Sequence, residues 1–164
     1  MDIYHQIKQA LLNHSTPERA KTMQRFFKTG KGEYGEGDLF HGVSVPQQRI
    51  IAKSFQASTE ASDIICLLDS VYHEERLTGV FILVDKFKKS CRTKNEDPWV
   101  KLYLSKTDRI NNWDLVDSSA HLILGKWLED KDRSILKKMA TSKLDRKSTR
   151  LNSSHEWISR MPSS

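Results

Sequence analysis

The fold of this chain is decided by residues 73–89, which read His-Glu-Glu-Arg-Leu-Thr-Gly-Val-Phe-Ile-Leu-Val-Asp-Lys-Phe-Lys-Lys. Apolar residues recur there at helical spacing, at Leu77, Val80, Phe81, Val84 and Phe87. An apolar face of this width is typical of an inner, heavily buried helix. We therefore expect Leu77, Phe81 and Val84 to lie in the core.

Gly79 interrupts this apolar helix at a cost of about 1 kcal/mol relative to alanine. The expected reason is close contact with a neighbouring helix. The helix then closes on a basic run: Lys86, Lys88, Lys89, Arg92 and Lys94. Two interpretations of this run stay open, a solvated face that complements the helix dipole or a contact with phosphate groups.

Helix pairs are expected on both sides of residues 73–89. A short helix at about 62–70 precedes it, a second pair covers about 97–106 and 113–128, and a third begins at about Lys131. The first helices of these units begin about 35 residues apart, which is typical of helical-hairpin repeats. One hairpin cannot bury its own apolar face, so the units should stack as an all-α solenoid. Further core residues are expected at Ile64, Leu68, Ile123 and Leu124.

Three helices are expected before this array. The first carries its apolar face on Ile3, Ile7, Ala10 and Leu11. The second begins at residues 15–18, with a capping box from Ser15 to Glu18 and Pro17 in the first turn. It should direct Ala20, Met23 and Phe27 inward. Pro46 opens the third helix, whose core residues are expected to be Ile50, Ile51 and Phe55.

Residues 30–42 hold five of the seven glycines and should form a mobile connection rather than a helix. The stretch lacks the strand–loop–helix context and the Lys-Ser/Thr ending of a phosphate-binding loop. The sequence therefore does not indicate nucleotide binding here.

Residues 112–119, Asn-Trp-Asp-Leu-Val-Asp-Ser-Ser, carry the most specific chemical pattern. Asn112 can cap a helix that has Asp114 in its first turn. Trp113 and Asp117 are four residues apart and so lie on one helix face. An aromatic plate beside a carboxylate is a plausible receptor for a cation. The same spacing also fits a second interpretation, in which Trp113 packs in the core and Asp117 is a solvated acid.

This segment resembles the signature of the DNA alkylation repair family, the AlkD-like DNA glycosylases built from HEAT-like helical repeats. Further segments resemble the family in the same order, at residues 23–28, 42–49, 73–77 and 128–134. The resemblance runs from about Ile3 to about Leu144. It implies that residues 1–144 are the N-terminal part of a HEAT-like solenoid that is truncated within a repeat.

The resemblance implies hydrolysis of the N-glycosidic bond of cationic alkylated purines, such as 3-methyladenine and 7-methylguanine, in double-stranded DNA. A carboxylate held near the positive charge that develops on the deoxyribose would stabilise the transition state and orient water. By resemblance this catalytic role belongs to Asp117. Trp113 and Phe26 are the expected DNA contacts, with Phe26 at a position where the family often has tyrosine. No metal ion or organic cofactor is implied, and we expect a monomer.

Two other functions stay open. The chain could be a non-catalytic HEAT-like module that binds DNA or a protein, keeping the curved helical surface without using Asp117 as a catalyst. It could also be an inactive fragment of the glycosylase. The second tryptophan and the DNA-gripping arginine of the family's later repeats have no counterpart here, so this chain by itself is expected to be nearly inactive.

Residues 145–155 resemble one reading frame of a sequencing adapter rather than the family. We therefore expect residues 145–164 to be a non-native, disordered tail, the alternative being a natural Ser/Arg-rich tail. The whole chain has 27 basic and 21 acidic residues, a net charge of +6. Residues 145–164 contribute four basic and two acidic residues, which leaves 23 and 19, or +4, for residues 1–144. That balance permits a DNA-binding surface without requiring one.

Other features of the sequence indicate a cytoplasmic protein. No run of 18 apolar residues could cross a membrane, and residues 1–5 lack the apolar region of a secretion signal. Cys66 and Cys91 lack metal-ligand spacing and are expected to be reduced thiols. His73 and His121 have no partners at ligand spacing either, so each is expected to be a capping, surface or core histidine.

Overall fold

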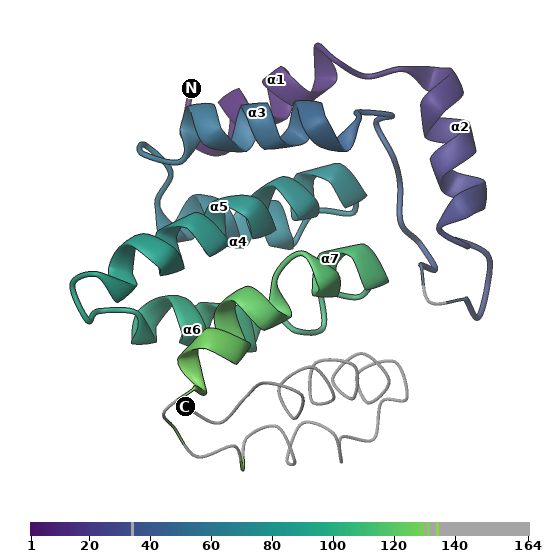
Figure 1. The fold of residues 1–164 in the computed structure, drawn as a ribbon. Helices are drawn as coiled ribbons and strands as arrows, with labels where there is room; N and C mark the ends of the chain where they lie inside the picture. The colour runs from purple at the N-terminus through teal and green to yellow at the C-terminus, as the bar shows by residue number, and fades with distance from the viewer. Residues whose placement is uncertain (34, 130, 132–133, 135–164) are drawn as a thin grey trace.

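The computed structural model describes residues 1–33, 35–129, 131 and 134, and this part of the chain is all-α (Figure 1), as the sequence predicts. Its elements in chain order are α1 (Ile3–Leu12), α2 (Pro17–Phe26), α3 (Val45–Phe55), α4 (Ala61–Leu68), α5 (His73–Cys91), α6 (Asp97–Ser105), α7 (Trp113–Asp117) and a π-helical turn, η1 (His121–Gly125). Within these residues the β-type pairing is a single bridge between Leu39 and Tyr72. The tail expected at 145–164 lies outside the described residues.

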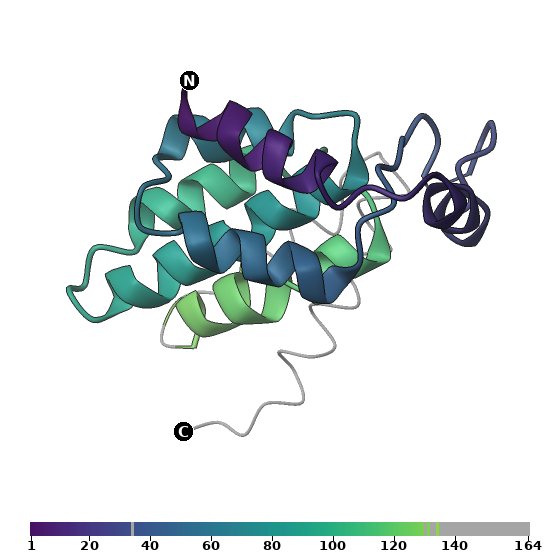
Figure 2. The same cartoon turned by 90° about the horizontal axis from the view of Figure 1, so that it is seen from above.

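The helices are stacked in two layers. Figures 1 and 2 show α3, α5 and the α7–η1 segment in one layer, with α1, α4 and α6 in the other. Helix α5 lies at the centre and contacts α1, α3, α4, α6, α7 and η1. Helix α2 stands beside the stack, at the same end as α7. This arrangement of helix upon helix is repeat-like, and it leaves one face of α3, α5 and η1 on the same side of the molecule.

The core is centred on α5 and follows the predicted inner faces. Ile64, Leu68, Leu77, Val84, Ile123 and Leu124 are all buried, as expected. Full burial of one such aliphatic side chain contributes about 1.5–3 kcal/mol to stability. Phe81 differs from the prediction because it is only partly buried. Its ring faces the open side of the layer, where the guanidinium of Arg49 lies 4.2 Å from the ring centre.

Gly79 has the structural role that the sequence predicts. A Cβ atom at this position would lie 2.9 Å from the Cβ atom of Leu67 on α4. Carbon atoms that close would force the two helices apart. The glycine therefore allows α4 and α5 to pack at short range.

The first three helices exist as predicted, but some details differ. Thr16, not Ser15, is the N-cap of α2 and makes no side-chain capping bond, so the predicted capping box is wrong. The Thr16 N–H instead donates to the carbonyl of His41, 3.1 Å away. This hydrogen bond joins the start of α2 to the loop that precedes α3.

Inward faces were predicted less well on α2 and α3 than on α5. Ala20 and Met23 are only half-buried because α2 stands beside the stack, while Phe27, just after α2, is buried. On α3, Ile51 is buried but Ile50 is 58% exposed. Consecutive residues lie about 100° apart around a helix, so both could not face the same neighbour.

The glycine-rich connection contains no helix within its described residues, as expected, but its end is firmly held. The Glu74 carboxylate accepts hydrogen bonds from the backbone N–H groups of His41, Gly42 and Val43, at 2.8–3.3 Å. Gly42 has a φ of +83°, which a glycine adopts without strain. In the part of the chain that the structure describes, no helix is long and apolar enough to cross a membrane.

Candidate functional site

Helix α7 positions the residues of the 112–119 segment. Asn112 is its N-cap, with a side chain that accepts a hydrogen bond from the Trp113 N–H at 2.9 Å, and Asp114 lies in the first turn. Both features are as predicted. Trp113 and Asp117 stand at the two ends of this short helix, four residues apart, so they share one face.

The helix predicted over residues 113–128 is not continuous. Helix α7 ends at Asp117 and is followed by a turn and then by η1, a π-helical turn. The hydroxyl of Ser119 donates to the carbonyl of Leu115 at 2.6 Å and lies 2.9 Å from the hydroxyl of Tyr103 on α6. A serine that bonds to the carbonyl one turn back bends a helix. Asp117 is therefore the last residue of α7, and the residues of η1 do not continue the same helix.

An aromatic wall, made of Phe26, Phe27 and Trp113, stands at the start of α7. The Trp113 ring stacks on Phe27 with centroids 5.7 Å apart, and Phe26 meets Trp113 edge-on at 6.1 Å. Trp113 is 44% exposed and Phe26 is 64% exposed, whereas Phe27 is buried. The interpretation of Trp113 as a core residue is therefore wrong. The structure brings the two predicted DNA contacts, Trp113 and Phe26, together on the surface.

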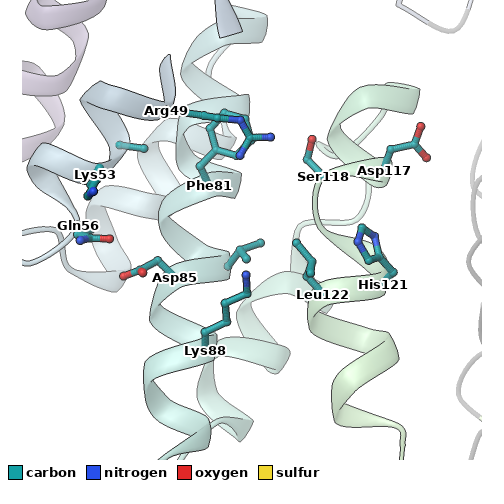
Figure 3. A pocket seen from close by; sticks show the side chains of 12 residues that line it. Arg49, Lys53, Gln56, Phe81, Asp85, Lys88, Asp117, Ser118, His121 and Leu122 are labelled. Atoms are coloured by element: carbon teal, nitrogen blue, oxygen red, sulfur yellow. The ribbon is translucent and has the colours of Figure 1, made fainter. Parts of the chain in front are cut away.

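A groove of about 580 Å³ runs between α3, α5 and the α7–η1 segment. Figure 3 shows Arg49 and Lys53 of α3 on one side, Phe81 and Lys88 of α5 along the floor, and the α7–η1 residues on the other side. The remaining side is formed by Asp117, Ser118, His121 and Leu122. The predicted catalytic residue thus lies at the rim of a groove that sequence analysis did not anticipate.

The groove carries more positive than negative charge. Arg49, Lys53 and Lys88 form no ion pair within the described residues, while Asp85 is paired with Lys89 at 2.8 Å. Two lysines of the basic run at the end of α5 therefore differ in position, because Lys88 lines the groove and Lys89 does not. Lys88 faces the groove, and Lys89 belongs to the solvated helix surface.

The Asp117 carboxylate is exposed and makes no hydrogen bond or ion pair with the part of the chain that the structure describes. In Figure 3 it is directed away from Arg49, so the groove cations do not neutralise it. An exposed, unpaired carboxylate can accept a hydrogen bond from water or interact with a nearby cation. The structure leaves Asp117 available for either role.

Behind the aromatic wall lies a buried charged cluster, formed by Asp38, His73, Arg76 and Asp114. His73 is completely buried, with Nε2 2.6 Å from Asp114 Oδ2 and Nδ1 3.7 Å from Asp38 Oδ2. Arg76 Nη2 lies 2.6 Å from the same oxygen of Asp38. Of the roles expected for His73, the structure shows a core histidine. Its two acidic partners are far away in sequence, so spacing gave no sign of them.

The pairing within this cluster favours the charged form of both Asp38 and His73. Burial opposes the charge on His73, but the hydrogen bond to Asp114 and the nearby Asp38 carboxylate outweigh it, so the pKa of His73 is raised. Burial likewise opposes the charge on Asp38, yet the contacts with His73 and Arg76 hold its pKa below the usual value. Burial lowers the pKa of Arg76, and the adjacent Asp38 carboxylate opposes that shift.

A second buried network ties α1 to α5 and is separate from the groove. The Glu75 carboxylate accepts from the Tyr4 hydroxyl at 3.2 Å and lies 2.9 Å from His41 Nε2. Burial and the Glu75 charge raise the pKa of Tyr4 to about 12. Together with the bonds from Glu74 to residues 41–43, these contacts explain why the acidic start of α5 is buried.

Comparison with known proteins gives one match. The sequence model of the DNA alkylation repair enzyme family matches residues 7–147. No curated protein and no solved structure matches the chain. The family match covers every segment on which the sequence resemblance rests.

Proposed function

The chain belongs to the family of DNA alkylation repair enzymes, and from that premise we propose that it hydrolyses the N-glycosidic bond of cationic alkylated purines in duplex DNA. The 3-methyladenine and 7-methylguanine lesions are the proposed substrates. The family match supports DNA alkylation repair, and the choice of reaction rests on the site.

One observation carries the proposal. Asp117 is exposed and unpaired within the described residues, lies at the rim of the basic groove, and is one helical turn from the half-exposed Trp113. The aromatic wall therefore offers π faces to a cationic base, and the carboxylate offers negative charge beside it. Such a combination suits a reaction whose substrate and transition state are both cationic.

The chemistry needs little more than this. An alkylated purine with a positive charge is already a good leaving group, and it departs with the electron pair of the glycosidic bond. Positive charge then develops on the deoxyribose, where Asp117 would stabilise it. A water molecule adds to the sugar carbon and loses a proton, which leaves an abasic site and the neutral alkylated base. Asp117 would also orient that water.

The groove cations would hold the DNA while the base is removed. Phosphate groups supply most of the affinity in protein–DNA binding, and lysine and arginine side chains are their usual partners. Arg49 is held over Phe81, so part of its conformational freedom is already lost before DNA binds. Lys53 and Lys88 line the same groove.

The test is release of 7-methylguanine from duplex DNA under single-turnover conditions, with the protein in excess so that a slow step is detected. Wild type and Asp117→Asn are compared, and Asp108→Asn serves as the matched control because Asp108 is exposed and lies outside the groove. Because the chain is expected to be nearly inactive by itself, we expect slow but measurable release by the wild type and the control, and a further strong loss in Asp117→Asn. Absence of release by the wild type would overturn the proposed reaction.

A second function is favoured by the groove itself, whose unpaired cations need no catalytic partner. A non-catalytic module would bind duplex or branched DNA through Arg49, Lys53 and Lys88 and leave Asp117 idle. DNA binding without base release, equal in wild type and Asp117→Asn, would support this function.

A further inference from the structure

The imidazole of His73 lies directly beneath the aromatic wall. Its ring centre is 4.7 Å from that of Phe27 and 5.1 Å from that of Phe40. Phe27 in turn stacks on Trp113. A single buried ring, Phe27, therefore contacts both the buried imidazole and the exposed indole.

Both nitrogens of His73 face carboxylates: Nε2 lies within hydrogen-bond distance of Asp114, at 2.6 Å, and Nδ1 lies 3.7 Å from Asp38, close enough for an electrostatic interaction. A neutral imidazole has one N–H group and could donate to only one of them. With His73 protonated, the two cations of the cluster, His73 and Arg76, balance the two carboxylates. With His73 neutral, the cluster would hold excess negative charge away from water, which burial disfavours. The geometry thus fits an imidazolium.

The contact with Asp114 reaches the residues proposed to meet DNA. Helix α7 consists of Trp113–Asp117 only, and a helix this short has little stability of its own. Its orientation depends on the contacts that its side chains make with the rest of the molecule. The bond from His73 to Asp114 attaches α7 to the first residue of α5, the most buried helix of the fold.

We propose that His73, held as an imidazolium between Asp38 and Asp114, is a positioning residue that sets the orientation of α7 and so presents Trp113 and Asp117 together to the DNA. The catalytic part of this inference rests on the proposed function, whereas the positioning of α7 does not. His73 itself is buried and touches neither DNA nor the reacting atoms.

The proposal predicts a particular dependence on pH. The charged groups that face His73 are Asp114 from α7, Asp38 from the loop before α3, and Arg76 from α5 itself. Loss of the His73 proton at high pH would remove the positive charge from the 2.6 Å contact with Asp114, while Asp38 would keep Arg76 as its partner. A neutral imidazole holds Asp114 only by a hydrogen bond without charge, so α7 would be held less firmly while the remainder of the fold is intact.

The first experiment follows the ring nitrogens of His73 and the indole N–H of Trp113 by NMR in the wild-type chain as the pH is raised. We expect doubly protonated His73 at neutral pH, and a shift of the Trp113 signal in step with its deprotonation. A neutral His73 at pH 7, or a Trp113 signal that ignores the titration, would overturn the proposal. This experiment uses only the wild-type chain, so its outcome depends neither on base release nor on whether a variant folds.

The second experiment compares the pH profile of base release in wild type, His73→Gln and His41→Gln. His41 is also a buried histidine paired with a carboxylate, Glu75, but within the described residues no hydrogen bond, ion pair or ring contact joins that pair to α7, so it is the matched control. We expect the His73→Gln rate to be on the order of tenfold lower or more, mainly through kcat, with no loss of rate at the pH where wild-type His73 deprotonates. His41→Gln should keep the wild-type profile even if its stability falls.

The two arms separate the failure of each idea. A wild-type rate and profile in folded His73→Gln would overturn the positioning role. No excision by the wild type, together with coupled NMR titrations of His73 and Trp113, would overturn the proposed reaction and leave the positioning of α7 standing.

Discussion

The two sides of α7 use charge in opposite ways. Behind it, Asp38, His73, Arg76 and Asp114 are buried or nearly so and paired with one another. In front of it, the groove cations and Asp117 are unpaired within the described residues. A buried, paired charge tolerates one geometry, because any movement leaves it without a partner in a dry environment. An exposed, unpaired charge is free to meet a ligand. The comparison separates the residues that fix the site from those that would use it.

Breaking the paired side should have the largest effect. Arg76→Ala leaves the Asp38 carboxylate buried beside His73 without its ion-pair partner, and should cost about 3–5 kcal/mol of unfolding free energy. Chemical denaturation at pH 7 measures this. The control, Lys106→Ala, removes an ion pair with the half-exposed Asp69 and should cost at most about 1 kcal/mol. Equal losses of unfolding free energy in the two variants would mean that the buried ion pair contributes no more to stability than the exposed one.

Removing the free carboxylate should affect activity rather than stability. Asp117→Asn keeps the size of an exposed side chain, so the unfolding free energy should change by less than about 0.5 kcal/mol. Base release should fall at least about tenfold, which corresponds to about 1.4 kcal/mol of transition-state stabilisation. Parallel denaturation and single-turnover assays measure the two effects. A large loss of stability with unchanged base release would show that Asp117 serves the fold and not the reaction.

Changing the pH should sharpen the comparison, with an effect smaller than the loss of Arg76. The pKa of His73 is raised in the folded state, so its contribution to stability is complete below its ordinary pKa of about 6.5 and is lost as the pH rises through the raised value. The pKa of Asp38 is lowered, so its contribution is present above about 3.9 and is lost as the pH falls through the lowered value. Denaturation across the pH range should show both losses, and His73→Gln should lack the one at high pH. A high-pH loss that persists in His73→Gln would assign it to another group.

The smallest effects are expected on the open side. Lys53→Ala and Lys88→Ala should each weaken DNA binding and reduce its salt-dependence slope by about 1, whatever the sequence of the DNA. Lys101→Ala is the matched control because Lys101 is an exposed lysine on α6, in the other helix layer. Binding titrations at several salt concentrations measure the slopes. If Lys101→Ala lowered the slope as much as Lys88→Ala, the groove would not be the DNA surface.

The sequence predicted most of what depends on local pattern. The apolar spacing on residues 73–89 identified the central helix, and Gly79 indicated its close contact with a neighbour, which proved to be α4. Faces with mixed polarity were harder, since adjacent apolar residues such as Ile50 and Ile51 compete for one inner position and only packing decides.

The remaining features depend on contacts between distant parts of the chain. The break after α7 involves the bond of Ser119 to Leu115 and the contact with Tyr103 on α6, and no local rule predicts that contact. The buried cluster joins Asp38, His73 and Asp114 across three separate segments. One signal was present but unused: four charged or titratable residues, His73–Arg76, begin a helix that is otherwise strongly apolar. Burial of that helix required partners for them.

Helix α2 buries no residue of its own, although Phe26 at its end forms part of the aromatic wall. A segment with few buried contacts opens locally at a low free-energy cost, while the centre of the core opens only with global unfolding. Backbone amides of α2 should therefore exchange with solvent much sooner than those of α5. One ring of the aromatic wall, Phe26, is then carried by a helix that unfolds locally at low cost. Another ring, Trp113, is carried by α7, which is bonded to the buried helix α5. Binding of DNA would convert this difference into slower amide exchange in α2, a change confined to one half of the wall.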